Sequence, residues 1–442
     1  MKFVFKIYIL FIVSTFSSVI FANSQENQYP VILVHGNGGW GRSEKDGFLY
    51  WGGQVDLEKE LNNTGYDVRV ATVAPYSSNW DRACELYAQL MGLDYIDYGK
   101  AHSEKFGHKR IVRISESESW SRVWSEEGIY PQWGESNERG INKIHLIGHS
   151  QGGQTVRLFA QLLEEGMGSE VEAVLGKNPS REEIEKAVVD GRLSGLFAGI
   201  HNDWVKSVST FATPNDGTTS ADIVNYTPGD LIAFFATPIN GIVMDSKGDI
   251  DNTNFSLKLD QWEMKRKSGE SFSSYFWRTL TNSKWKGTKD FSNYDLGTIG
   301  AREMNTWVKE QANIYYFSYS CLGTRRMLIG YNQIPDEHLN PNFALNARAM
   351  GAYLNYLTGI TYEWLPNDGY VNTISQDGAK VGRAYNNISA FNFEKKAKIG
   401  MWNSFKLLSK TDHEDIIGRD TSEEMDGLIN FYAKHIEILY SL

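Results

Sequence analysis

Short runs of apolar, β-branched residues recur along the chain, separated by longer segments with helical periodicity. Buried strands form such runs, whereas helices repeat apolar residues every three or four positions. Strands that alternate with helices are typical of a parallel sheet covered by helices. The pattern therefore predicts an α/β fold with a mostly parallel central sheet. The predicted strands are Val31 to Val34, Val68 to Val73, Ile144 to Ile147, Val205 to Phe211 and Ile314 to Tyr319.

The end of the chain predicts a long amphipathic helix. Thr421 and Glu424 fit a capping box, in which two residues satisfy each other's free backbone N–H groups. Apolar residues follow at helical spacing, so one face of this helix should pack on the sheet. They are Met425, Leu428, Ile429, Tyr432, Ile436 and Leu439.

Two stretches interrupt the alternating pattern and are interpreted as insertions, 110–140 and about 216–255. The sequence predicts no role for the first. The second is predicted to contain a mobile lid, because an apolar cluster lies on a segment broken by Pro228 and Pro238. A buried core helix would explain the same side chains. The cluster comprises Leu231, Ile232, Phe234, Phe235, Ile239, Ile242, Val243 and Met244.

The N-terminus predicts a secretory signal peptide over residues 1–22, which leaves 23–442 as the mature domain. Lys2 and Lys6 precede an apolar stretch from Ile7 to Phe21 that ends in small and polar residues, the order found in cleavable leaders. A membrane anchor is the alternative, but the apolar core is short for one. The sequence therefore favours a secreted, extracellular protein without an integral membrane anchor.

The net charge limits the classes of binding partner, and the cysteine content limits the role of disulfides. The formal net charge of −10 becomes −12 when Lys2 and Lys6 leave with the leader, which argues against nucleic acid. Contact with a lipid surface must then rest on apolar side chains. With only Cys84 and Cys321, no disulfide framework holds the chain together, and whether the two pair stays open.

The residues around Ser150 carry the strongest chemical signal. The predicted strand from Ile144 leads into Gly148-His149-Ser150-Gln151-Gly152, and a helical stretch from Gln154 to Leu162 follows. This order is the nucleophile elbow of the α/β-hydrolase fold, where a strained turn lifts the serine hydroxyl out of the sheet edge. The flanking glycines remove Cβ atoms that would collide there. Ser150 is the predicted nucleophile.

Two backbone N–H groups are predicted to form an oxyanion hole, because an ester carbonyl gains negative charge under attack. In this fold one donor follows the nucleophile, here Gln151, and the other lies after the first strand. That loop reads His35-Gly36-Asn37-Gly38-Gly39, and Asn37 is the predicted donor. A phosphate-binding loop is the alternative, but the Lys-Ser/Thr of a P-loop is missing.

The general base and acid should follow the nucleophile in the order acid, then histidine. Asp368, in an Asn-Asp-Gly turn ahead of the strand-like residues 370–374, is the candidate acid. His413 follows it in a loop just before the final helix, where this fold presents its base. The other downstream histidines are less suitable, because two precede Asp368 and one lies in the final helix. They are His201, His338 and His435.

Longer segments of the chain match one family in sequence and in order. They are Tyr50-Trp51-Gly52-Gly53, Ser78-Asn79-Trp80-Asp81-Arg82-Ala83-Cys84-Glu85, Asp97-Tyr98-Gly99-Lys100-Ala101-His102, His149-Ser150-Gln151-Gly152-Gly153-Gln154-Thr155, Ala212-Thr213-Pro214, Lys258-Leu259-Asp260-Gln261-Trp262, Asn367-Asp368-Gly369 and Asp412-His413. These segments resemble the large secreted true lipases of thermophilic bacilli and staphylococci. The resemblance runs from Pro30 to about Thr421.

The resemblance implies that Asp368 is the triad acid and His413 the general base. It also implies structural zinc that ties an insertion at 81–110 to the segment at about 255–262. Two histidines and two aspartates make a closed tetrahedral set, which leaves no position for substrate. The implied zinc ligands are Asp81, His102, His108 and Asp260.

The same family binds structural calcium behind the catalytic histidine. The resemblance places its acidic ligands at Asp415 and Asp420, with backbone carbonyls near Asn340 and Thr421. The chain departs from the family here, with Asp415 in place of glutamate and Thr421 in place of proline. A shorter carboxylate can need a bridging water to reach calcium. Asn37 also replaces a phenylalanine, although its N–H donor is unaffected.

The leading hypothesis is a secreted triacylglycerol lipase that hydrolyses carboxylic esters through an acyl-enzyme, with a lipid or ester at a lipid–water interface as its partner. A carboxylesterase or phospholipase with the same triad is the alternative, because the sequence does not define the shape of the acyl pocket. A non-catalytic binding protein on this fold is a third hypothesis. It is disfavoured because all three triad positions are filled.

Overall fold

The computed structural model describes residues 27–442 except 43, 45–48, 54, 139, 225–255, 268, 286–287, 384–386 and 420–424. The predicted signal peptide, the apolar cluster of the predicted lid, the capping box and Asp420 lie outside the described residues. In the described part of the chain, no helix is both long and apolar enough to cross a membrane.

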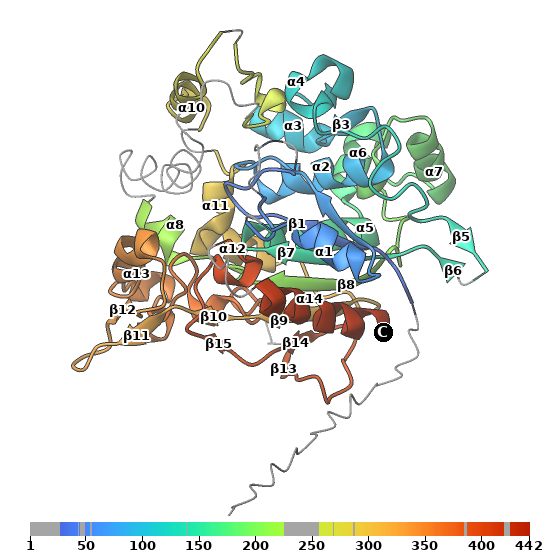
Figure 1. Cartoon of the computed structure of the whole chain (residues 1–442). Helices are drawn as coiled ribbons and strands as arrows, with labels where there is room; N and C mark the ends of the chain where they lie inside the picture. Colours follow the sequence, from blue (N-terminus) through green and yellow to red (C-terminus); the bar gives the residue numbers. More distant parts are fainter. Residues whose placement is uncertain are drawn as a thin grey trace, which may run out of the picture.

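A seven-stranded sheet forms the centre of the molecule (Figure 1), with the order β13-β14-β9-β8-β7-β1-β2. Every neighbouring pair of strands in it is parallel. The strands are β1 (Val31–Val34), β2 (Val68–Ala71), β7 (Ile144–His149), β8 (Val205–Phe211), β9 (Tyr315–Tyr319), β13 (Ile388–Ala390) and β14 (Trp402–Ser404). The predicted α/β fold with a parallel sheet is thus confirmed.

Strand β1 illustrates why these apolar runs are strands. Successive side chains of a strand point to opposite faces, and all four residues of β1 are fully buried. Ile32 and Val34 belong to one hydrophobic core, whereas Val31 and Leu33 belong to another. The sheet therefore has apolar cover on both faces, as expected for a parallel sheet.

Helices α2 (Asn79–Met91) and α5 (Gln151–Glu165) cover one face, and α1 (Leu57–Asn63) and α14 (Met425–Tyr440) cover the other. The predicted apolar stripe of the last helix packs on the sheet, with Leu428, Tyr432, Ile436 and Leu439 in its core. Cys84 lies in the first core and Cys321 in the second, so the two are free thiols.

The remaining elements surround this framework. The helices are α3 (Lys100–Phe106), α4 (Glu118–Ser121), α6 (Gly168–Leu175), α7 (Arg181–Val189), α8 (Thr219–Val224), α10 (Phe272–Leu280), α11 (Ser292–Leu296), α12 (Thr298–Asn305) and α13 (Ala344–Met350). Short two-stranded ribbons pair β3 (Tyr95–Asp97) with β4 (Ile111–Arg113), β5 (Ser136–Asn137) with β6 (Gly140–Ile141), β10 (Cys321–Leu322) with β15 (Leu408–Ser409), and β11 (Thr324–Arg326) with β12 (Gln333–Pro335).

Two features of the fold differ from the sequence expectation. The strand-like residues 370–374 form no strand; a turn and the 3₁₀ helix Thr373–Ser375 stand there. Strands β13 and β14 were not predicted, because each is only three residues long and carries no extended apolar run.

Candidate active site and metal centre

Ser150 lies on a strained turn between β7 and α5. Its backbone has φ 55° and ψ −128°, a conformation that costs free energy for a residue with a side chain. Neighbouring glycines make the turn possible. A Cβ on Gly152 would lie 2.1 Å from the Val34 carbonyl oxygen, and one on Gly148 would lie 2.4 Å from the Gly152 carbonyl carbon. The strand, turn and helix therefore lift Ser150 out of the sheet edge.

His413 and Asp368 meet beside this turn. His413 Nδ1 lies 2.8 Å from Asp368 Oδ2, and the His413 backbone N–H donates to the Asp368 carbonyl at 3.0 Å. The loops that carry them are joined through β10. The Gly323 N–H, next to this strand, donates to Asn367 O, and Thr411 N–H donates to Leu322 O. The structure thus brings together two residues far apart in the sequence.

The Asp368 carboxylate is buried and fully hydrogen-bonded. Its Oδ1 accepts from the N–H groups of Tyr370 and Val371, and its Oδ2 also accepts from Gln376 Nε2 at 3.0 Å. Burial by itself lowers the pKa of His413, but the charge of Asp368 and its hydrogen bond outweigh burial and raise the pKa above 6.5. An Asp that orients and charges a histidine in this way suits a general base.

Two backbone N–H groups near Ser150, those of Asn37 and Gln151, are the candidate oxyanion donors. Gln151 is the first residue of α5, so its N–H has no partner within the helix. Among the described residues, neither Asn37 N–H nor Gln151 N–H donates to a protein acceptor. The Asn37 side-chain oxygen is also buried without a partner. This loop can therefore offer N–H groups to a negatively charged oxygen.

A small pocket of about 50 Å³ lies beside Ser150. Ser150, His413 and Asn37 line it, and so do three residues for which the sequence predicted no role, Tyr50, Leu296 and Tyr370. Tyr50 lies in one of the segments that resemble the lipase family, and this resemblance is the sequence signal that could have identified it. Leu296 and Tyr370 reach the pocket only through the tertiary fold.

Two other serine–histidine contacts lie away from this turn, one between strands β7 and β8 and one between β8 and helix α14. His145 Nδ1 is 2.8 Å from Ser207 Oγ, and His435 Nε2 is 2.8 Å from Ser209 Oγ. All four residues are fully buried. The second ring nitrogen of His145 contacts Asn27 Oδ1, and that of His435 contacts the Tyr319 hydroxyl. Within the described part of the chain, neither histidine has a hydrogen bond to a carboxylate, so these contacts suit packing rather than catalysis.

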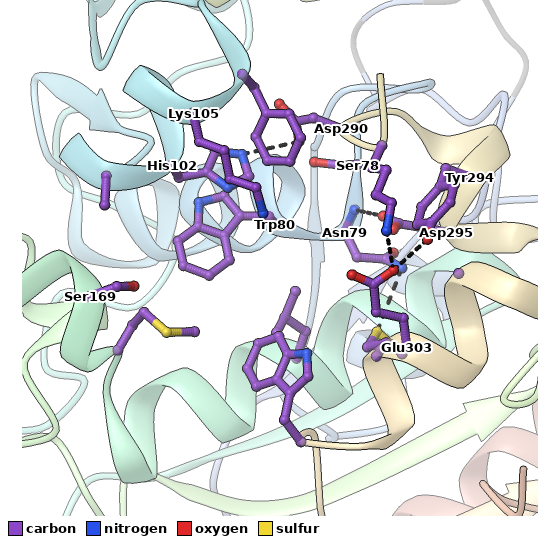
Figure 2. Close-up of a pocket in the computed structure, with 18 of the residues that line it drawn as sticks. Ser78, Asn79, Trp80, His102, Lys105, Ser169, Asp290, Tyr294, Asp295 and Glu303 are labelled. Carbon is purple, nitrogen blue, oxygen red and sulfur yellow. Dashed lines mark hydrogen bonds and ion pairs between the residues drawn. The ribbon is translucent and has the colours of Figure 1, made fainter. Parts of the chain in front are cut away.

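A second cluster of titratable residues lies beside α2, on the side where α3 and α4 stand at the top of Figure 1. Figure 2 shows His102 and Asp290 at one end of the neighbouring pocket, with His102 Nε2 3.1 Å from Asp290 Oδ1. His108 Nε2 lies 3.1 Å from Asp290 Oδ2. One ligand atom from each of Asp81, His102, His108 and Asp290 lies within 4.8 Å of the others.

This cluster has the chemistry of a metal site. The Nε2 atoms of His102 and His108 and three carboxylate oxygens of the cluster are buried without hydrogen-bond partners, which is costly unless a cation sits among them. His108 Nδ1 donates to the Lys109 carbonyl at 2.9 Å, which leaves Nε2 bare for a metal. Burial lowers the pKa of His108, but Asp290 and Asp81 outweigh it and raise that pKa to about 9. The carboxylates therefore favour a cation among the side chains of this cluster.

The structure corrects the fourth residue of the predicted zinc set. Asp260 lies outside the cluster: its Oδ2 accepts from Ser119 Oγ at 2.6 Å, and its Oδ1 lies 3.5 Å from Lys265 Nζ. Asp290 takes its place. The predicted segment still contacts the cluster, because Gln261 Nε2 donates to Asp81 Oδ2 at 2.8 Å. Sequence spacing in an irregular region could not decide which aspartate turns inward.

The described residues of the predicted calcium set lie close behind His413. Asp415 Oδ2 accepts from Asp412 N–H at 2.7 Å, and Asp412 Oδ2 accepts from Asn340 N–H at 2.9 Å. Burial, and then the charge of Asp415, raise the pKa of Asp412 to about 7. Asp412 was not among the predicted ligands. Asp420 and Thr421 lie outside the described residues.

A serine on a strand-to-helix turn, at the carboxyl edge of a parallel sheet, with acid and histidine on later loops, is the arrangement of the α/β hydrolases. Comparison with known proteins agrees. Residues 27–441 match the family model described as lipase-like, C-terminal domain. The chain belongs to this family.

Individual relatives are similar over most of the chain. It is 31% identical to Lipase 1 of Staphylococcus aureus over 404 residues, which cover 90% of this chain and 52% of the relative. The chain thus spans about half the length of the curated relatives it matches. The structure of EstA from Clostridium botulinum is 41% identical with a TM-score of 0.80, covering 94% of this chain and 88% of that one. Lipase 1 from Pelosinus fermentans is 40% identical with a TM-score of 0.74, covering 93% and 98%.

Proposed function

We propose that this protein is a secreted carboxylic ester hydrolase of the lipase type, with Ser150 as nucleophile, His413 as general base and Asp368 as the acid that orients it. The observation that carries the proposal is the 2.8 Å contact between His413 Nδ1 and Asp368 Oδ2 beside a serine on a strained turn. Family membership supports it. Acylglycerols at a lipid–water interface are the proposed substrates.

The reaction follows from the roles of these groups. Ser150 Oγ attacks the ester carbonyl while His413 Nε2 takes its proton, and the N–H groups of Asn37 and Gln151 hold the oxyanion. The intermediate collapses to an acyl-enzyme when His413 returns the proton to the departing alcohol. Water then attacks the acyl-enzyme while His413 takes its proton, and His413 returns that proton to Ser150 Oγ as the acyl–oxygen bond breaks and the acid leaves.

Structural zinc is proposed at Asp81, His102, His108 and Asp290. Two neutral histidines and two carboxylates would balance the charge of a divalent ion in a closed site, which supplies no reactive position. Trp80 stacks on His102 with ring centroids 4.6 Å apart, and Trp262 lies 4.9 Å from His108. These rings would shield the site from water. Calcium near Asp415 and Asp420 is proposed on the family resemblance.

Export is proposed from the leader-like residues 1–22, and the region around 216–255 is proposed as a lid. A carboxylesterase is the second candidate function, because the pocket beside Ser150 is small. Phospholipase activity would use the same triad. Rates on emulsified long-chain triacylglycerols, dissolved short-chain esters and phospholipids separate the three.

The proposal is tested by comparing Ser150→Ala with Ser207→Ala. Ser150→Ala is expected to fold, lose nearly all turnover and no longer react with a fluorophosphonate probe, because the nucleophile acts as a unit with its base. Ser207→Ala breaks only the contact to His145 and is expected to keep both properties below its melting temperature. A Ser150→Ala variant with a tenth of wild-type turnover would contradict the proposal.

A further inference from the structure

Tyr50 and His149 form a hydrogen-bonded chain between the oxyanion loop and the backbone of His413. The Gly36 N–H lies 2.8 Å from the Tyr50 hydroxyl oxygen. The same hydroxyl lies 2.6 Å from His149 Nδ1. At the other end of the ring, His149 Nε2 lies 2.8 Å from the His413 carbonyl oxygen.

The direction of every bond in this chain follows from chemistry. A carbonyl only accepts, so His149 Nε2 must carry a hydrogen and donate to His413. Burial first, and then His413, lower the pKa of His149 well below 6.5, so the ring is neutral and Nδ1 accepts. The Tyr50 hydroxyl therefore donates to Nδ1. Its oxygen accepts from Gly36, whose N–H only donates.

The Gly36 end of this hydrogen-bonded chain is held in place by Arg82 and His35. Arg82, fully buried, donates to the carbonyl oxygens of His35 and Ala74. His35 Nε2 accepts from the Val73 N–H, so its Nδ1 donates to the Gly36 carbonyl at 3.0 Å. Both polar groups of Gly36 are thus bound, one by His35 and one by Tyr50. Asn37, the proposed oxyanion donor, is the next residue.

Hydrogen bonds hold three parts of His413, namely its ring, its backbone N–H and its backbone carbonyl. Asp368 fixes its ring and its backbone N–H, and His149 fixes its carbonyl. The rings of His149 and His413 also lie 4.7 Å apart. Among the described residues, the bond from His149 is the contact that fixes the His413 carbonyl, whereas Thr411 N–H and Asp412 Oδ2 hold the same loop through Leu322 O and Asn340 N–H.

We infer that Tyr50 and His149 are positioning residues, which set the distance between the oxyanion hole and the general base through the chain Gly36–Tyr50–His149–His413. The inference rests on the proposed function. Neither residue takes part in proton transfer, because both ends of the chain are backbone groups. A shift of about 1 Å between catalytic groups can cost roughly a hundredfold in rate.

The test compares Tyr50→Phe with Tyr66→Phe on a dissolved short-chain ester. Tyr50→Phe removes only the hydroxyl and is expected to lower kcat about 10- to 100-fold, with KM changed much less. Tyr66, whose hydroxyl contacts Glu437 on the surface, is the matched control and should keep wild-type kcat. An unchanged kcat in Tyr50→Phe would overturn the inference.

A second pair of variants separates positioning from packing. Gln at 149 can place its amide nitrogen near the position of Nε2 and still donate to His413, whereas Asn is too short and reaches only the Nδ1 position. We expect His149→Gln to keep a larger kcat than His149→Asn at equal melting temperature. A His149→Gln variant that loses more kcat than His149→Asn would overturn the inference, and if the Asn variant does not fold, Tyr50→Phe decides.

A double variant tests whether the two residues act as one chain. In that case Tyr50→Phe combined with His149→Asn should lose little more than the worse single change, whereas losses that multiply would indicate independent roles and overturn the inference. Fluorophosphonate labelling of wild-type Ser150 keeps the two proposals apart. If the wild type is neither labelled nor active, the proposed function fails. If it is active and Tyr50→Phe is equally active, only the positioning role fails.

Discussion

Asp295 Oδ2 accepts a 2.6 Å hydrogen bond from the backbone N–H of Asn79. Asn79 begins α2, which carries Asp81, and Asp295 lies on α11, which follows Asp290. Gln154 of α5 donates to the Asp295 carbonyl at 3.1 Å, and the next residue, Leu296, lines the pocket beside Ser150. The proposed metal site is therefore joined to the proposed active site by one short segment.

Asp290→Asn is expected to abolish zinc binding and to lower the melting temperature, because it removes the carboxylate that both histidines face. An ion held at about a hundred times its dissociation constant contributes close to 2.7 kcal/mol. Elemental analysis of the purified protein, followed by melting curves with and without chelator, measures both effects. Asp260→Asn is the control and should retain zinc. A zinc-free wild type, or an Asp260→Asn variant that alone loses zinc, would contradict the assignment.

The acid limb of the kcat/KM profile should lie above pH 6.5. The base must be neutral to accept a proton, and its raised pKa keeps it protonated to a higher pH than a free histidine. Asp368→Asn removes the charge that raises this pKa, so the limb should move to lower pH while the plateau falls by about 10⁴-fold. Glu414→Gln removes a weaker neighbouring charge and should shift the limb less. A limb below pH 6.5 in the wild type would contradict this prediction.

Gly152→Ala should destabilise the protein by several kcal/mol, on the order of the largest single-residue effects, because its Cβ would meet Val34 O at 2.1 Å. Gly427→Ala is the matched control. A Cβ there meets nothing within 4 Å on an exposed helical position, and alanine should stabilise the helix by up to about 1 kcal/mol. Denaturant unfolding of both variants tests the contrast, and a Gly152→Ala protein as stable as wild type would refute it.

Added calcium should raise the melting temperature of the wild type but not of Asp415→Asn. The reason is that Asp415 and Asp412 concentrate negative charge behind His413, where an oxygen-ligand cation would relieve it. Glu337→Gln changes an exposed carboxylate of another acidic group and should keep the calcium response. An identical response in Asp415→Asn and the wild type would remove Asp415 from the calcium site.

The sequence by itself determined the central sheet and the strand-to-helix turn that carries Ser150. The predicted strands at Val31 and Val205 match β1 and β8 in both bounds, because continuous apolar runs can be buried only in the middle of a covered sheet. Ser150 was identifiable because a strained turn admits only glycine two residues to either side, a local constraint that is written directly into the sequence.

Only the tertiary structure decided which distant residues meet. Asp260 begins the 3₁₀ helix Asp260–Trp262 and Asp290 lies in a bend, and the tertiary fold, not the spacing along the chain, places Asp290 against the histidines. Strands β13 and β14 are too short to leave an apolar period. Tyr50 reaches His149, 99 positions away, because parallel strands bring their carboxyl ends to one edge of the sheet. Contacts between loops depend on how the whole chain packs, and no local pattern encodes them.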